Sequence, residues 1–128
     1  MNCEEIYDFC RRLPYAEETF PFDNTSLVMK VRGKMFALIP LDNPVTVSVK
    51  CDPEWAIELR EQYSGINPAY HFNKKHWNMM DLTGSVPRLL LLELIAHSYN
   101  LVIASLPRTL RAGLDPITHT DIKIWQPL

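Results

Sequence analysis

The sequence predicts an α+β fold: a two-layer sandwich in which an antiparallel sheet of about five strands carries helices on one face. Residues 27–51 alternate apolar and polar side chains between short turn signals, which indicates strands joined by hairpins. Residues 2–13, 53–64 and 86–105 instead repeat apolar side chains at helical spacing. Clustered strands with three amphipathic helices are typical of two layers, and the other sheet face is then left to water or to a partner.

The elements are expected in the order α-β-β-β-α-β-β-α. Asn2 is predicted to cap the first helix, with Glu5 completing a capping box. Two strands then meet in a hairpin at Arg32-Gly33-Lys34, and Leu41-Asp42-Asn43-Pro44 predicts a second turn. The segment from Val45 to Cys51 alternates most regularly, so we expect this strand to bury one face.

The second half begins with a strong helix start at Asp52-Pro53-Glu54, and Gly65 is expected just beyond the end of this helix. Two short strands, Tyr70–Phe72 and Trp77–Leu82, are predicted on either side of the turn Asn73-Lys74-Lys75-His76. Within the second of these strands, the alternate residues that begin with Trp77 share one face, and we expect that face to form a wall of the core.

Residues 86–105 are the most apolar part of the chain. Glu93, His97 and Asn100 recur at steps of four and three, and they form a polar stripe along one helix face. The segment is therefore predicted to be a buried core helix with one wet edge rather than a membrane span. His97 lies one turn from Glu93 and is expected to pair with it.

Length and charge limit the alternatives. A chain of 128 residues suits one domain, which we expect at 1–107, with 108–128 as a C-terminal extension packed on it or wrapped around it. The net charge of −2 argues against a dedicated nucleic-acid binder. Residues 27–80, however, hold seven Lys or Arg against five Asp or Glu, so a basic face is compatible with the total.

Signals for catalysis and metal binding are missing from the sequence. There is no G-x-S-x-G motif and no glycine-rich phosphate loop. The three cysteines lack C-x-x-C spacing, and His71 and His76 have no obvious third ligand, so we expect structural histidines. We predict no enzyme, no catalytic residue, no metal and no cofactor. No signal segment precedes the first helix, so the expected compartment is the cytoplasm, and no membrane partner is expected.

Three blocks stand out together: Tyr70-His71-x-Asn73-Lys74-x-His76-Trp77-Asn78, Leu82-x-Gly84-Ser85-Val86-Pro87 and His97-Ser98-Tyr99-x-Leu101-Val102. In this combination the chain resembles the MmcQ/YjbR family of small bacterial proteins over roughly residues 3–107. The resemblance implies a secretion-chaperone-like α+β domain, in an arrangement described as a "double wing" for DNA binding. Two features depart from the family: Arg88-Leu89-Leu90 replaces the usual acidic or polar residues, and the tail after Pro107 extends beyond the matched part.

The candidate site is formed by the polar residues of the two hairpin turns: Lys30, Arg32, Lys34, Asn73, Lys74, Lys75 and His76. If both hairpins project the same way, their five basic residues form one patch that contacts phosphates, with Asn73 and His76 as hydrogen-bond donors. Each phosphate contact adds ~0.9 to the salt slope, so such binding would be weak and salt-sensitive. The simpler interpretation is a solvated turn whose lysines protect an edge hairpin from aggregation.

Two further functions remain open. The acidic N-terminal segment, the leucine-rich last helix and the uncovered sheet face also suit a protein-interaction or chaperone-like module without nucleic acid. A small-molecule pocket lined by Tyr70, Trp77 and His97 is the third possibility. The sequence leaves the oligomeric state undetermined.

Overall fold

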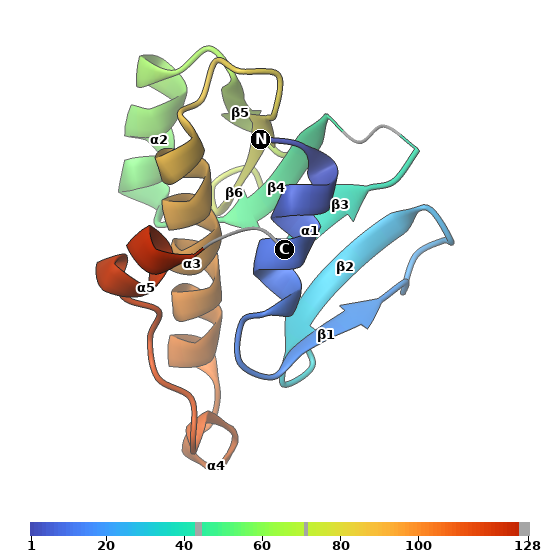
Figure 1. The fold of residues 1–128 in the computed structure, drawn as a ribbon, viewed down its shortest axis with the longest axis vertical. Helices are drawn as coiled ribbons and strands as arrows, with labels where there is room; N and C mark the ends of the chain where they lie inside the picture. Colours follow the sequence, from blue (N-terminus) through green and yellow to red (C-terminus); the bar gives the residue numbers. More distant parts are fainter. Residues whose placement is uncertain (43–44, 71, 126–128) are drawn as a thin grey trace.

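The computed structural model describes residues 1–42, 45–70 and 72–125. Within them, a six-stranded antiparallel sheet in the order β1-β2-β3-β4-β6-β5 carries helices on one face (Figure 1). The strands are β1 (Ala16–Thr19), β2 (Ser26–Val31), β3 (Lys34–Pro40), β4 (Thr46–Lys50), β5 (Ile66–Pro68) and β6 (Trp77–Asp81). The helices are α1 (Cys3–Arg11), α2 (Pro53–Gln62), α3 (Arg88–Ser105), α4 (Arg108–Arg111) and α5 (His119–Ile124). The predicted α+β fold is confirmed, with one strand more than expected.

Both predicted helix starts are present. The Asn2 side chain accepts a hydrogen bond from the Glu5 N–H at 2.9 Å, and the Glu5 carboxylate accepts one from the Asn2 N–H at 3.4 Å. This is the expected capping box, and it satisfies two N–H groups that a helix start leaves unpaired. At the start of α2, the Asp52 carboxylate accepts from the Trp55 N–H at 3.1 Å, directly before Pro53.

The hairpin between β2 and β3 turns at Arg32 and Gly33, as predicted. Their φ angles of 50° and 83° are both left-handed, which matches the two-residue turn that follows the natural twist of paired strands. The register then shifts, because Lys30 pairs with Met35 while Met29 pairs with Ala37. The extra residue, Phe36, is fully buried. The bulge therefore sends Phe36 toward the helices, where its ring meets that of Tyr99 at 5.4 Å.

The two faces of the sheet differ in chemistry. The face under the helices holds Met29, Ile39, Val47 and Met80, and each of them is 0% exposed. On the opposite face, here called the open face, the register aligns Leu38 of β3, Ser48 of β4 and Met79 of β6 in one row. The helices cover only the first of these faces (Figure 1).

Trp77 lies on the open face, so the expectation that its side of β6 forms the core wall is wrong. Asn78 and Met80, on the other side of the strand, face the helices, and the Asn78 amide donates to the Ala56 carbonyl of α2 at 3.3 Å. Trp77 is buried nonetheless, because the Phe72 ring stacks on it at 4.8 Å. On this face of the sheet, Trp77 is therefore shielded from solvent by an aromatic side chain of a loop and not by a helix.

The strand predicted at Tyr70–Phe72 is wrong. The partner of β6 is Ile66–Pro68, and Phe72 instead donates its N–H to Ala69 in a turn. Aromatic side chains favour strands on average, whereas a proline argues against one; β5 tolerates Pro68 because it is an edge strand. The other edge strand, β1, was not predicted, because Ala16–Thr19 shows no clear apolar alternation.

Gly65 has a different role from the one expected. Helix α2 ends with Tyr63 as its C-cap, and Gly65 does not have a left-handed backbone. A Cβ atom at position 65 would instead collide with the Oγ of Ser85, in the loop that leads into α3. Glycine suits this position because two segments approach closely here, and any other residue would displace the Ser85 side chain.

Helix α3 is the central core element. By length and composition it is apolar enough to cross a membrane, yet half of it is buried inside the protein against the sheet, α1 and α5. Ser98, which is 0% exposed, joins it to two strands. The Ser98 hydroxyl donates to the Phe36 carbonyl of β3 at 2.6 Å and accepts from the Lys50 N–H of β4 at 2.9 Å.

The neighbours of Ser98 tie α3 to two more segments. The His97 Nε2 accepts from the Asp52 N–H at 3.1 Å, and its ring lies edge-on to Trp55 at 4.7 Å. The Tyr99 hydroxyl donates to the Pro14 carbonyl at 2.7 Å. The expected pairing of His97 with Glu93 is therefore wrong, since the imidazole turns toward the start of α2.

Two residues of the polar stripe on α3, Glu93 and Asn100, contact the C-terminal tail. The Asn100 amide makes two hydrogen bonds with the backbone of Ile117, at 2.8 and 3.0 Å. His119 of α5 lies 3.3 Å from the Glu93 carboxylate. Beyond α5, the Trp125 ring meets Phe9 of α1 edge-on at 5.2 Å. The stripe expected to meet water thus holds residues 117–125 against α3.

Replacing Ser98 with alanine should destabilise the protein by about 1–3 kcal/mol, because a buried N–H and a buried carbonyl lose their partner together. Ser105→Ala is the matched control on the same helix. Its hydroxyl donates only within the helix, to Val102, and the residue is exposed. Urea unfolding of both variants measures the difference. Equal stability of Ser98→Ala and Ser105→Ala would contradict this account of α3 packing.

The free energy of unfolding should also decrease as the pH is lowered, because of His97. Burial lowers the pKa of His97, although the nearby Asp52 charge opposes the shift. Below the unfolded-state pKa of ~6.5, the unfolded chain therefore takes up a proton before the folded protein does, and stability is lost as pH falls toward the folded pKa. Protonation also removes the Nε2 acceptor. Urea unfolding at several pH values should show a shallower fall for His97→Gln than for the wild type; identical profiles would refute the assignment.

Candidate nucleic-acid interface

The two basic turns lie at the same end of the sheet. Strands β2, β4 and β5 end there, and β3 and β6 begin there, because all neighbouring strands are antiparallel. The β2–β3 turn and the β5–β6 connection, residues 69–76, therefore leave the sheet in the same direction. Only β4 separates β3 from β6, so these two strands lie ~10 Å apart, and the centres of the two turns are ~14 Å apart across the strands. We call this the basic end.

In the first turn, Arg32 is held by an aromatic neighbour. Its guanidinium carbon lies 4.3 Å from the centre of the Tyr15 ring, and Tyr15 immediately precedes β1 at this same end. Lys34 is exposed beside it. Lys30 points onto the open face opposite Glu17 of β1, so part of its charge is offset by a carboxylate.

In the second turn, Asn73 organises the backbone. Its side-chain oxygen accepts from the Lys75 N–H at 3.0 Å, and its carbonyl accepts from the N–H groups of His76 and Trp77 at 3.1 and 3.0 Å. The His76 carbonyl in turn accepts from the Cys51 N–H at 2.7 Å. Asn73 and His76 thus shape the loop and tie it to β4.

The lysines of this turn are the groups presented to solvent. Lys74 and Lys75 are both exposed, and the Lys74 ammonium lies 5.0 Å from the centre of the Tyr70 ring. The Arg60 guanidinium of α2 donates to the Lys74 carbonyl at 3.0 Å and steadies the tip. The structure therefore brings Arg32, Lys34, Lys74 and Lys75 to one end of the molecule. His71 lies outside the described residues.

Two cations of the basic end were not among the predicted site residues. Lys50 is the last residue of β4 and lies between the two turns, pairing with Trp77 on the open face. Arg60 reaches the second turn from α2. Alternation along β4 places Lys50 on the open face, but only the strand order shows that it stands between the turns.

The opposite end of the sheet is acidic. Asp23 in the β1–β2 connection, Asp42 after β3 and Asp81 at the end of β6 all lie there. Hydrogen bonds from Thr25 and Ser26 lower the pKa of Asp23, and those from Thr83 lower the pKa of Asp81. Both carboxylates therefore stay ionised, and the net charge of −2 conceals a sheet with one basic and one acidic end.

Other chemistry is not assembled among the described residues. Trp77 lies on the open face while His97 contacts the start of α2 on the helix side, so these residues do not line one pocket with Tyr70. Burial is the main cause that raises the pKa of the Cys51 thiol to about 12, which keeps it protonated. In the described part of the chain, no three His, Cys, Asp or Glu side chains form a metal-binding group.

Comparison with known proteins confirms the family resemblance. A model of the YjbR family matches residues 11–101. The uncharacterized protein YjbR of Escherichia coli K12 is 34% identical over 112 residues, which cover 87% of this chain and 95% of the relative. The uncharacterized protein YbdF of Escherichia coli O157:H7 is 32% identical over 113 residues, covering 84% and 93%.

Solved structures agree with these matches. A Deinococcus radiodurans protein described by the DUF419 domain superposes with a TM-score of 0.78 at 42% identity, covering 83% of this chain and 82% of its own. A Pseudomonas syringae protein superposes with a TM-score of 0.68 at 28% identity, covering 79% and 98%. The matched family region includes both basic turns and most of α3 and ends before α4. The chain belongs to the YjbR family.

Proposed function

We propose that this protein is a small cytoplasmic binding module that contacts the phosphate backbone of duplex DNA through its basic end. The observation that carries the proposal is the shared direction of the β2–β3 turn and the β5–β6 connection. Two hairpins that project in the same direction, with β4 between them, match the two wings that the family resemblance implies. Their exposed cations suit phosphate contacts, which position a protein on DNA without reading its sequence.

The local contacts favour a prepared cationic surface. Arg32 rests on Tyr15 and Lys74 on Tyr70, so both side chains are partly oriented before a ligand arrives. The backbone of the second turn is fixed by Asn73 and by Arg60. Less conformational freedom is then lost on binding.

The acidic end sets the orientation of binding. Asp23, Asp42 and Asp81 repel a polyanion, so the basic end approaches the DNA and the acidic end points away. With four cations at the two tips, the salt slope should not exceed about 3.6, at ~0.9 for each phosphate contact. We therefore propose weak, sequence-independent and strongly salt-dependent binding.

The protein-interaction alternative is favoured by a different surface. Helix α3 uses its apolar residues inside the protein, against the sheet, α1 and α5. The open face of the sheet, in contrast, has no helix layer over it (Figure 1). A protein partner would therefore meet the open face, and such binding does not exclude DNA at the basic end.

The double variant Lys34→Gln/Lys75→Gln should weaken DNA binding and lower the salt slope by about 1.8, because one phosphate contact is lost from each turn. Fluorescence anisotropy with a labelled duplex of mixed sequence, measured over a series of salt concentrations, gives both quantities. Neither lysine is buried, so the fold should be unaffected.

The single variants Lys75→Gln and Lys123→Gln provide a charge-matched comparison. Lys123 is an exposed residue of α5, which packs on α3. We expect Lys123→Gln to keep the wild-type slope and Lys75→Gln to lower it. The proposal fails if the wild type does not bind the duplex at low salt, or if the two single variants change the slope equally.

A further inference from the structure

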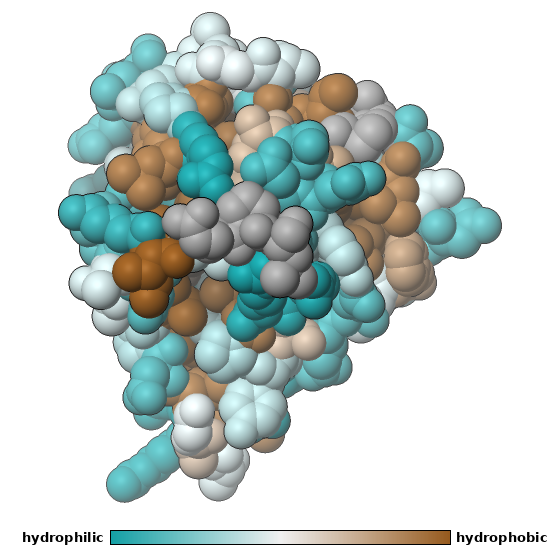
Figure 2. Space-filling view, in the orientation of Figure 1, coloured by the Kyte–Doolittle hydropathy of each residue, from teal (hydrophilic) through white to brown (hydrophobic). Residues whose placement is uncertain are grey.

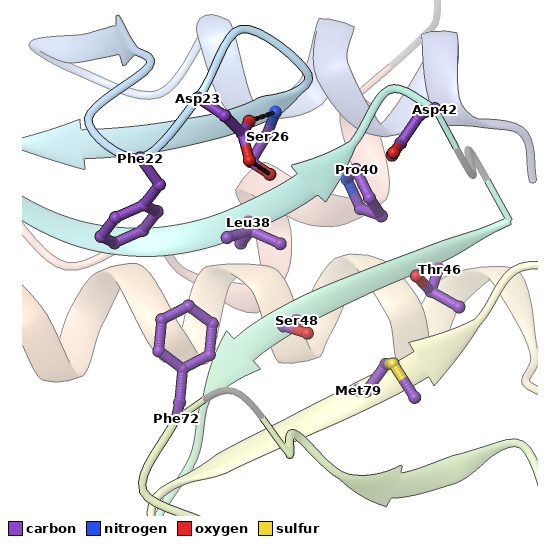
Figure 3. Close-up of a pocket in the computed structure, with 10 residues that line it drawn as sticks. All are labelled: Phe22, Asp23, Ser26, Leu38, Pro40, Asp42, Thr46, Ser48, Phe72 and Met79. Carbon is purple, nitrogen blue, oxygen red and sulfur yellow. Dashed lines mark hydrogen bonds between the residues drawn. The ribbon is translucent and has the colours of Figure 1, made fainter.

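The open face contains a pocket of about 490 Å³. Its floor is the row of Leu38, Ser48 and Met79, contributed by three neighbouring strands. Figure 3 shows these side chains pointing into the space between two loops. The volume falls within the range of about 300–1,000 Å³ that ligand pockets have.

Two phenylalanines from different loops wall the pocket. Phe22 comes from the β1–β2 connection and Phe72 from the β5–β6 connection, and their rings lie beside Leu38, with Phe22 above Phe72 in the view of Figure 3. Phe72 is fixed by its stack on Trp77, with ring centres 4.8 Å apart. Phe22 is 63% exposed, so this wall is open to solvent and its ring gains burial only when something occupies the pocket.

Exposed apolar side chains are concentrated at the acidic end of the sheet. Phe20, Phe22, Leu41 and Val45 are each more than 40% exposed, and all lie in the connections β1–β2 and β3–β4. Phe22 lines the pocket of the open face, whereas Phe20 and Leu41 line a separate groove beside α1. Figure 2, which views the protein from the helix side, shows hydrophobic side chains on the right of the view, near these connections, while the pocket lies on the far face. Single exposed apolar residues are ordinary, whereas a group of them marks an interaction surface.

Two carboxylates line the same pocket. Asp23 is held in place by the N–H groups of Thr25 and Ser26, at 2.9 and 2.7 Å, and Asp42 lies across from it beyond Pro40 (Figure 3). An apolar floor with aromatic walls selects a large apolar side chain. The acidic rim selects a positive charge beside it and disfavours phosphate.

We infer that the open face binds a peptide segment that inserts a large apolar side chain between Phe22 and Phe72 and places a neighbouring lysine or arginine against Asp23 and Asp42. This inference gives the protein-interaction alternative a site and a ligand class. The site is distinct from the proposed DNA surface, because its carboxylates lie at the end of the sheet opposite to the basic turns, and it shares with that surface only the β5–β6 connection, which carries Phe72.

A second copy of the chain fits less well. Its own exposed segments with this chemistry include Tyr70 beside Lys74 at the basic end and Ile124 beside Lys123 on α5, and both lie outside the pocket. Docking of such a segment into the pocket would join two different surfaces of successive copies. Such a head-to-tail contact continues into a ring or an open chain.

Selection from a displayed library of random peptides, with the full chain as bait, tests the inference. Enriched peptides should carry a large apolar residue with lysine or arginine close to it. For a labelled synthetic copy of an enriched peptide, Phe22→Ala should weaken binding at least about tenfold, the effect of one buried large apolar side chain. Asp42→Asn should weaken it less and reduce its salt dependence.

Phe20→Ala is the matched control. Phe20 belongs to the same loop and is 48% exposed, but it lines a separate groove beside Cys3 and Tyr7 of α1. It should leave peptide affinity unchanged, and so should Lys34→Gln/Lys75→Gln at the basic end. The latter result separates this site from the proposed DNA surface.

Four results would overturn the inference. They are a library without enrichment, enriched peptides that lack basic residues, equal affinity of Phe22→Ala and the wild type, and equal losses for Phe20→Ala and Phe22→Ala. Light scattering at the assay concentration adds a fifth. Self-association that Phe22→Ala abolishes would assign the pocket to a second copy instead.

Discussion

One buried hydroxyl group, that of Ser98, joins α3 to the centre of the sheet. Continuing the register of β3 and β4 would place Phe36 opposite Lys50, but the Ser98 hydroxyl stands between them, accepting from the Lys50 N–H and donating to the Phe36 carbonyl. A side chain of α3 thus completes a backbone ladder, as a buried water would. At the basic end of the sheet, β3 and β4 are therefore joined through Ser98 and not by a direct backbone hydrogen bond between Phe36 and Lys50. The same contact fixes the bulge at Phe36 in the core. Tyr99, the next residue of α3, secures the Phe36 ring from the same side.

Antiparallel connectivity explains how a nearly neutral chain acquires two ends of opposite charge. Successive connections in a meander alternate between the ends of a sheet, so the β1–β2 and β3–β4 connections share one end while the β2–β3 turn lies at the other. Helix α2 and the short β5 then return the chain so that residues 69–76 join the β2–β3 turn. Charges that are interleaved along the sequence are thereby separated in space. The net charge of −2 is the sum over the whole chain, whereas a ligand that contacts one end of the sheet is exposed mainly to the charges of that end.

The sequence predicted those elements whose local signals are strong. Helix caps, the Arg32-Gly33 turn and the alternation through β4 depend on neighbours in the chain, and each agrees with the structure. The predictions that were wrong concern residues whose structure is determined by contacts with residues far away in the sequence. Phe72 is aromatic, as strand residues often are, but it lies in a turn where its ring stacks on Trp77. His97 was expected to pair with Glu93 of its own helix, but it accepts a hydrogen bond from Asp52 before α2. For the candidate site, the cations of the two turns were predictable from charge and turn chemistry. The position of Lys50 between them, and the aromatic walls of the open face, follow only from the strand order.

The β5–β6 connection belongs to both surfaces. It presents Lys74 and Lys75 at the basic end and Phe72 to the pocket of the open face, while Asn73 joins the two parts through its backbone and side-chain hydrogen bonds. A ligand that orders this segment at one surface also changes the cost of ordering it at the other. Thermodynamic reciprocity requires that each of two such ligands alter the affinity of the other by the same factor. If both proposed ligands bind, the shared loop links the DNA surface and the peptide pocket energetically, although the two surfaces differ in charge.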